Sequence, residues 1–218
     1  MNPKPVIFWD WNGTLLNDVD CCVQAMNKLL EARNLRQLDR SRYRELFDFP
    51  VKNYYEKLGF DFRKEAFELP AHQFMKHYNE LVGQATVFEE VTPLLHRLQQ
   101  QGFRQFILSA MEQALLEDLT KKNGIQQYFE GIQGIDNHLA NGKLETAKRL
   151  FKKINVPAKN CLLIGDSLHD AEVANDLKIQ VLLFSQGHFS QSRLLKSNQA
   201  VAHDYSAIEA FIEKQFGF

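Results

Sequence analysis

Short runs of apolar residues alternate with longer amphipathic stretches along most of this chain. Residues 6–9 are all apolar and are followed by an acidic residue, and further apolar-rich runs occupy 103–108, 161–164 and 181–184. Runs of this length are typical of parallel strands that are buried on both faces. Strands that alternate with helices indicate right-handed crossovers. The predicted fold class is therefore α/β, a Rossmann-like doubly wound parallel sheet.

Two weaker strands are predicted at 131–135 and 200–202. The helices between strands show apolar residues at helical spacing and recognisable ends: Thr92 and Pro93 suit an N-cap and a first helical position, and Gly102 suits a helix end. The helices expected here run from Thr92 to Gly102, over 112–123, from a polar loop through Asn141 and Lys143 to about Ile154, over 170–177 and over 207–216.

The segment between the first two strands has a different pattern. Apolar residues keep helical spacing over 19–30, 39–49 and 70–82, with a short turn at 53–58, and no β-rich run interrupts them. Ten aromatic residues in this segment are enough to build a small core. We therefore predict an α/β core domain at 1–16 and 86–218, with a helical cap domain inserted at 17–85.

Composition narrows the class of partner. Lys and Arg number 26 against 27 Asp and Glu, so no nucleic acid and no membrane partner is expected, and a small molecule is the default partner. No apolar run approaches the ~20 residues that span a bilayer, and residues 1–5 lack a signal-peptide core, so we expect a cytoplasmic protein. We also expect a monomer or weak dimer. Cys21, Cys22 and Cys161 suit neither disulfides nor zinc and are expected to be buried.

Polar side chains follow the predicted strands where the strands end. Asp10 follows the first strand, Ser109 the second and Asp166 the fourth, with Asp170 four residues later, while Lys143 precedes a helix. The carboxyl ends of parallel strands share the edge of a sheet at which ligands bind. Carboxylates make a hard oxygen site for Mg²⁺, a hydroxyl can hold a phosphoryl oxygen, and a lysine balances charge. Together these residues predict a phosphoryl-transfer site.

Each of these residues also has an ordinary structural role open to it. Ser109 could cap the following helix, Asp170 could be an N-cap, and Lys143 could be solvated, with Lys148 as a competitor for the lysine role. His188 follows another strand end and either faces the site or lies in a surface loop.

Asp10-Trp11-Asn12-Gly13-Thr14, the strand ending at Ser109, Lys143, and Gly165-Asp166-Ser167-Leu168-His169-Asp170 occur in the order of four family motifs. The chain resembles the haloacid dehalogenase-like hydrolase superfamily, whose motifs are Asp-x-Asp-Gly-Thr, a strand ending in Ser or Thr, a Lys, and Gly-Asp-x-x-x-Asp. The helical insertion between the first two motifs resembles the cap of the phosphoglycolate phosphatase-like branch.

The resemblance implies a role for each matching position. Asp10 would be the nucleophile that forms an aspartyl-phosphate, and Mg²⁺ would be bound by Asp10, the backbone carbonyl of Asn12 and Asp166. Asp170 would bind the metal through water or orient Lys143.

The resemblance also implies a phosphate cradle. Ser109 would hydrogen-bond the transferring phosphoryl group, and Lys143 would neutralise charge. Backbone N–H groups from Trp11, Asn12, Gly13 and Thr14, and from Ala110, would donate to the phosphate oxygens.

Position 12 departs from the motif, because Asn12 stands where these phosphatases usually have a second Asp. That Asp protonates the leaving group, which an amide cannot do, although Asn12 can still hydrogen-bond the leaving oxygen. We expect a slow Mg²⁺-dependent phosphatase, unless a substrate group, water or a carboxylate such as Asp18 supplies the proton. The alternatives are a non-catalytic phosphate-binding protein with a regulatory or interaction role and, third, a dehalogenase.

Overall fold

The computed structural model describes residues 4–135 and 142–217, so most of the polar loop predicted before Lys143 lies outside the described residues. Six parallel strands form one sheet in the order β3-β2-β1-β4-β5-β6. The strands are β1 (Val6–Trp9), β2 (Arg104–Glu112), β3 (Gly131–Ile135), β4 (Cys161–Gly165), β5 (Gln180–Phe184) and β6 (Ala200–Ala202). This order confirms the predicted doubly wound parallel sheet.

Both faces of the sheet are buried, which explains the continuous apolar strands. In β1, Ile7 and Trp9 belong to one apolar cluster and Val6 and Phe8 to the other. The first cluster includes residues of α5 (Val91–Gln100), α6 (Gln113–Lys122) and α10 (Tyr205–Phe216). The second includes residues of α7 (Gly142–Ile154), α8 (Leu168–Leu177) and α9 (Gln191–Leu194). Short 3₁₀ turns lie at Gln126–Tyr128, Ala158–Asn160 and Leu195–Ser197.

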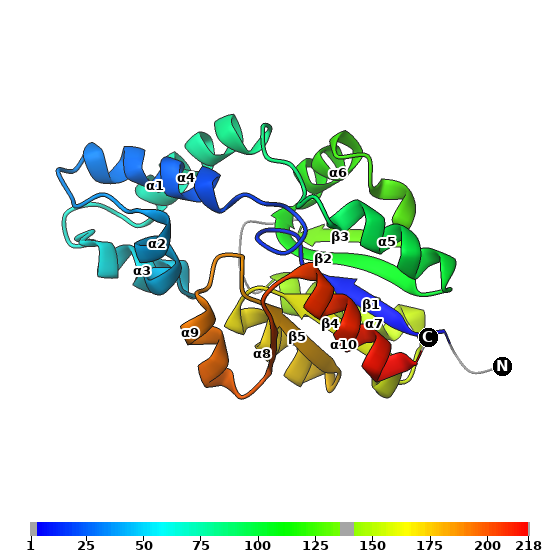
Figure 1. Ribbon diagram of the computed structural model, residues 1–218. Coiled ribbons are helices and arrows are strands. Elements are labelled where there is room, and N and C mark those ends of the chain that lie inside the picture. The colour runs from blue at the N-terminus through cyan, green and yellow to red at the C-terminus, as the bar shows by residue number, and fades with distance from the viewer. Residues whose placement is uncertain (1–3, 136–141, 218) are drawn as a thin grey trace.

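The segment between β1 and α5 contains only helices among its regular elements. These are α1 (Val19–Glu31), α2 (Arg40–Leu46), α3 (Val51–Leu58) and α4 (Glu68–Val82), and Figure 1 shows them beyond the carboxyl end of β1. An antiparallel bridge between Leu16 and Val87 joins the two chain crossings at the base of this segment. We call these four helices the cap; its division from the core as a separate domain stays a prediction. No helix in the described ranges is long and apolar enough to cross a membrane.

Several element ends differ from the prediction. Helix α2 ends at Leu46 rather than Phe49, because Phe47 leaves the helical conformation and Pro50 disfavours a helical residue before it. The predicted turn at 53–58 belongs to the two-turn helix α3. Apolar spacing alone does not record where a short helix meets a proline.

The capping alternatives for two site residues are wrong. Strand β2 continues past Ser109, and the carboxylate of Glu112 caps α6 by accepting from the N–H groups of Ala114 and Leu115. Ser167 is the N-cap of α8, and Asp170 lies three residues inside the helix. Neither Ser109 nor Asp170 is therefore occupied as an N-cap.

Candidate active site

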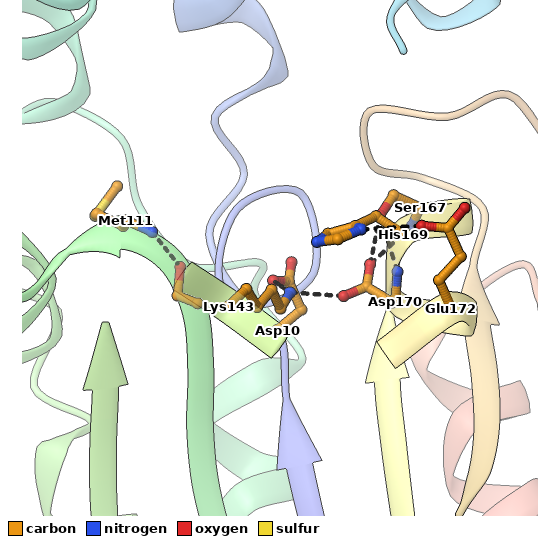
Figure 2. A network of polar contacts seen from close by, with 8 residues as sticks. Asp10, Met111, Lys143, Ser167, His169, Asp170 and Glu172 are labelled. Carbon is orange, nitrogen blue, oxygen red and sulfur yellow. Dashed lines mark hydrogen bonds and ion pairs between the residues drawn. The ribbon is translucent and has the colours of Figure 1, made fainter. Parts of the chain in front are cut away.

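A buried lysine bridges two carboxylates at the carboxyl edge of the sheet (Figure 2). Asp10 follows the central strand β1, and Lys143 comes from the first turn of α7. The Lys143 ammonium donates to Asp10 Oδ1 and, at 2.6 Å, to Asp170 Oδ1. The Lys143 side chain is 4 % exposed, whereas Lys148 is 46 % exposed and pairs with neighbouring surface carboxylates. The solvated alternative for Lys143 is therefore wrong.

Asp170 is held so that it can orient this lysine. Its second oxygen, Oδ2, accepts from the Ser167 backbone N–H at 3.1 Å and from the Ser167 hydroxyl at 2.6 Å. These bonds form part of a capping box at the start of α8. Burial acts to raise the pKa of Asp170, but Lys143 lowers it below its ordinary value. Asp170 is thus an ionised anchor for Lys143.

Three carboxylates crowd around the lysine. Side-chain oxygens of Asp10, Asp166 and Asp170 lie within 4.8 Å of one another, and each residue is at most 7 % exposed. Burial, with the neighbouring carboxylates, raises the pKa of Asp166 to about 8, and burial raises the pKa of Asp10 to about 6 even though Lys143 opposes it. One ammonium against three carboxylates leaves an excess of negative charge. This oxygen-rich cluster fits a hard divalent cation such as Mg²⁺, with the backbone carbonyl of Asn12 in the adjoining loop.

The loop after Asp10 requires glycine at position 13. Gly13 has φ +72°, and a Cβ there would lie 2.3 Å from Asp166 Oδ2. The same close approach recurs across the site, where a Cβ on Gly187 would lie 2.1 Å from that oxygen. The two glycines let the backbone enclose Asp166.

The predicted phosphate cradle is only partly available in this conformation. The Gly13 N–H donates to Leu16 O and to Asp18, and the Thr14 N–H donates to Trp11 O, so in this conformation neither N–H is free to donate to a phosphate oxygen. These turn bonds close the loop on itself.

The hydroxyls and the second strand offer other donors. Ser109 is fully buried, and its Oγ accepts from the Met111 N–H at 3.0 Å, which leaves its own O–H to donate (Figure 2). Thr14 Oγ1 is buried without a hydrogen-bond partner, and Ala110 is half-buried on β2 beside Ser109. Trp11 is fully buried, and its backbone N–H hydrogen-bonds Asp10.

Asp18 lies at the centre of a hydrogen-bond network that sequence reasoning did not predict. It occupies the N-cap position of α1 but makes no capping bond. Its Oδ1 accepts from the Gly13 N–H at 2.9 Å and contacts His188 Nε2 at 3.2 Å. Its Oδ2 accepts from Asn12 Nδ2 at 2.8 Å and from the Tyr78 hydroxyl at 2.7 Å. This fully buried carboxylate therefore has four nitrogen and oxygen partners, and the Cys22 thiol donates to Oδ2 as a fifth, at 3.9 Å.

His188 is buried in the site, so the surface-loop alternative for it is wrong. Its backbone N–H donates to Asp166 Oδ2, and its Nδ1 contacts the Tyr43 hydroxyl at 2.8 Å. Burial acts to lower the pKa of His188, but Asp18 raises it to about 9. Burial likewise acts to raise the pKa of Asp18, and His188 holds it below its ordinary value. The two side chains form a buried ion pair.

Cys22 completes a second cluster of potential ligands with Asp18 and His188. The four partners of Asp18 already use its oxygens, and burial raises the pKa of the Cys22 thiol well above its ordinary value. A protonated thiol is a poor metal ligand. The cluster is therefore a hydrogen-bond network rather than a metal centre.

His169, in the fourth motif, also reaches the site. Its Nδ1 contacts Glu172 at 3.2 Å, and Nε2 is buried without a hydrogen-bond partner. Figure 2 shows the ring extending over the edge of the sheet toward Asp10. The position of His169 beside Asp170 was the only sequence signal for it.

The match to known proteins covers most of the chain. A family model described as haloacid dehalogenase-like hydrolase matches residues 6–184. A solved haloacid dehalogenase-like hydrolase from Streptococcus pneumoniae has a TM-score of 0.82 at 20 % identity and covers 96 % of this chain and 98 % of its own. That structural likeness shows the shared fold.

The similar proteins carry more than one activity in their names. A phosphoglycolate phosphatase from Colwellia psychrerythraea is 25 % identical over 202 residues, covering 86 % of this chain and 87 % of the relative. A 5′-nucleotidase from Pseudomonas aeruginosa is 22 % identical over 173 residues, covering 76 % of each. Identity at this level does not carry a substrate from one protein to another.

Proposed function

This chain belongs to the haloacid dehalogenase-like hydrolases and is similar to their phosphoglycolate phosphatase-like branch, and from that premise we propose a magnesium-dependent phosphatase of a small phosphorylated metabolite. The observation that carries the proposal is the buried bridge from Lys143 to Asp10 and Asp170 beside Asp166. Such a cluster presents a carboxylate nucleophile together with the positive charge that a phosphate needs.

The reaction follows from these groups. An Asp10 oxygen attacks phosphorus while the bond from phosphorus to the leaving oxygen breaks, which gives an aspartyl-phosphate. Water then cleaves this acyl phosphate and releases inorganic phosphate. Lys143 offsets the charge of the approaching phosphate, and the Ser109 hydroxyl donates to a phosphoryl oxygen. A bound Mg²⁺ supplies further charge neutralisation at the phosphate.

Asn12 limits the leaving groups that react well. An alkoxide needs a proton as it departs. The amide N–H groups of Asn12 are not acidic enough to transfer a proton near neutral pH. A positioned general acid is typically worth ~10² to 10⁴ in rate. Substrates whose leaving group is already a weak base should therefore react best.

A panel of phosphate monoesters, assayed with Mg²⁺ for phosphate release, tests the proposal. Aryl phosphates and at least one metabolite should be hydrolysed, and Asp10→Asn should serve as the inactive blank because it lacks the attacking oxygen. Turnover by Asp10→Asn equal to that of the wild type would show that Asp10 is not the nucleophile. If the wild type hydrolyses no ester, the proposed phosphatase activity is wrong.

A second candidate is a non-catalytic phosphate-binding protein. It is favoured by Asn12, whose two amide hydrogens are already taken by Asp18 and Tyr78. Binding of inorganic phosphate with Mg²⁺, without turnover of any aryl ester, would select it. Dehalogenase chemistry ranks third, because that branch generally works without magnesium while this chain keeps Asp166 and Asp170 in the carboxylate cluster.

A further inference from the structure

Tyr78 of α4 reaches the loop after Asp10 directly through its hydroxyl, and Tyr43 of α2 reaches it indirectly through His188. Asn12, Asp18, Tyr43, Tyr78 and His188, here called the Asp18 hub, form one connected set of hydrogen bonds. We propose that Tyr78 and Tyr43 are positioning residues: the Tyr78 hydroxyl, through Asn12 and Asp18, and the Tyr43 hydroxyl, through His188, hold the loop after Asp10 in the reactive arrangement. The cap then completes the site in addition to covering it. The inference rests on the proposed phosphatase function.

The first arm of the hub orients Asn12. Its Nδ2 donates to Asp18 Oδ2 at 2.8 Å and to the Tyr78 hydroxyl at 2.7 Å, and that hydroxyl donates to the same Asp18 oxygen at 2.7 Å. These three groups close a ring. Flipping the amide would place its oxygen against an ionised carboxylate, so the ring permits one orientation.

Tyr78 closes this ring from another part of the fold. It belongs to α4 and is 66 residues from Asn12 in sequence, and it is 4 % exposed. Without its hydroxyl, Asp18 loses a donor and Asn12 loses an acceptor in a place that water reaches poorly. The remaining members must then rearrange or stay unpaired.

The second arm joins the hub to the carboxylate cluster. The Tyr43 hydroxyl, from α2, contacts His188 Nδ1, and His188 contacts Asp18 through its ring and Asp166 through its backbone N–H. The Gly13 N–H also donates to Asp18. One buried carboxylate therefore connects two cap helices with the loops on both sides of the site.

The chain offers a matched control for a purely structural role. Tyr54, in the cap helix α3, is 1 % exposed, and its hydroxyl is buried without a hydrogen-bond partner. Tyr54→Phe removes a buried cap hydroxyl, as Tyr78→Phe and Tyr43→Phe do, but leaves the hub intact.

The experiment measures kcat and KM on an aryl phosphate with Mg²⁺, per folded protein, for the wild type and the three Tyr→Phe variants. Tyr78→Phe should lower kcat about tenfold or more with a smaller change in KM, because the loop loses its geometry while the phosphate contacts remain. Tyr43→Phe should have a smaller effect in the same direction, and Tyr54→Phe should match the wild type. Equal kcat in Tyr78→Phe and Tyr54→Phe would overturn the proposal.

A second readout does not depend on turnover. Hydrogen exchange of the peptide spanning 11–18 should be faster in Tyr78→Phe than in the wild type and unchanged in Tyr54→Phe. If the wild type hydrolyses no ester, the phosphatase proposal fails, and this exchange comparison alone decides whether Tyr78 holds the loop. Unchanged exchange in Tyr78→Phe would then reject the positioning role.

Discussion

Asn12 and Asp18 are matched to each other. The amide of Asn12 donates to the Asp18 carboxylate at 2.8 Å, and Asp18 is fully buried. A carboxylate at position 12 would face a second carboxylate at hydrogen-bond distance. Two ionised carboxylates at that separation repel each other strongly in a buried site. The amide of Asn12, unlike a carboxylate, is therefore compatible with the neighbouring Asp18 carboxylate.

Restoring the motif by Asn12→Asp should consequently destabilise the protein. We expect the free energy of unfolding to fall by about 1–3 kcal/mol, because a buried hydrogen bond is replaced by repulsion. The exchange Asn12→Asp with Asp18→Asn should recover only part of this loss, because it relieves the repulsion but removes the ionised partner of His188, and it should raise the rate on alkyl phosphates relative to aryl phosphates. Thermal melts and rates on both ester classes check this prediction. If the single variant Asn12→Asp is as stable as the wild type and faster on alkyl phosphates, Asn12 and Asp18 are not matched in this way.

Asp166 illustrates a conflict between stability and metal binding. It lies beside two other carboxylates, so Asp166→Asn should raise Tm in the presence of a chelator by relieving repulsion. Mg²⁺ should raise the Tm of the wild type but not of the variant, because a ligand that binds only the folded state stabilises it.

The control for the metal prediction is Asp176→Asn, which changes a half-exposed carboxylate in α8, the helix that follows Asp166. It should keep the wild-type response to Mg²⁺. If Mg²⁺ shifts the Tm of the wild type and of Asp166→Asn equally, Asp166 is not a ligand of the metal.

At the scale of elements, an arginine-rich contact joins α2 of the cap to the loop after β5. The Arg44 guanidinium donates to the carbonyls of Ser185, Gly187 and Phe189. Arg193, in α9, contacts the cap in the opposite direction: it donates to the carbonyls of Arg44 and Phe47 and pairs with Asp48 at 3.3 Å. Planar guanidinium groups satisfy several carbonyls at once, so this contact suits a loop with few regular hydrogen bonds.

Asp48 makes this contact sensitive to acid. Partial burial acts to raise its pKa, but the Lys57 hydrogen bond and Arg193 hold it below the ordinary value. A lowered folded-state pKa gives stability that is present above the unfolded value of about 3.9 and is lost as pH falls through the folded value. Asp48→Asn should therefore cost about 0.5–1 kcal/mol at pH 7, the upper part of the range for ion pairs that solvent still reaches.

The acid prediction is checked by melting both proteins across pH. The Tm difference between the wild type and Asp48→Asn should persist from pH 7 to 5 and shrink below about pH 4. A difference that stays constant down to pH 3 would show that the Asp48 charge does not stabilise the contact.

At the scale of the whole molecule, the cap joins the core at two adjacent crossings. Asn17 N–H donates to Thr86 O at 3.0 Å, and Phe88 N–H donates to Leu15 O at 3.1 Å. Two antiparallel crossings beside each other allow rotation of a lid about the line between them. The hydrogen bonds of the Asp18 hub and those of Arg44 and Arg193 would then break together when the lid opens.

Hydrogen exchange should record that motion. A metal-fluoride phosphate analogue with Mg²⁺ should slow exchange at 15–18 and 85–88, because binding favours the closed cap. Exchange in β4, far from the crossings in sequence, serves as the internal reference. Confirmed binding with unchanged exchange at both crossings would indicate a rigid cap.

Much of the candidate site could be predicted because it lies where strands end. Asp10 and Asp166 adjoin apolar runs that place them at one edge of a parallel sheet, whereas Lys143 is indicated by its place at the start of a helix, in the order of the family motifs. The sequence could not assign the N–H groups of Gly13 and Thr14, because their acceptors depend on how one turn closes. It also left His169 unnoticed, since a polar residue inside a helix carries no periodic signal.

The sequence by itself determined the alternation of strands and helices, through apolar periodicity, and indicated the family and the candidate carboxylates and lysine, through the order of four motifs. Tertiary structure alone decided the partners of Asn12. Asp18, Tyr78 and His188 reach one another over separations of up to 170 residues, through contacts that exist only when the cap packs against the core. Such contacts depend on side-chain direction and docking, which no local pattern encodes.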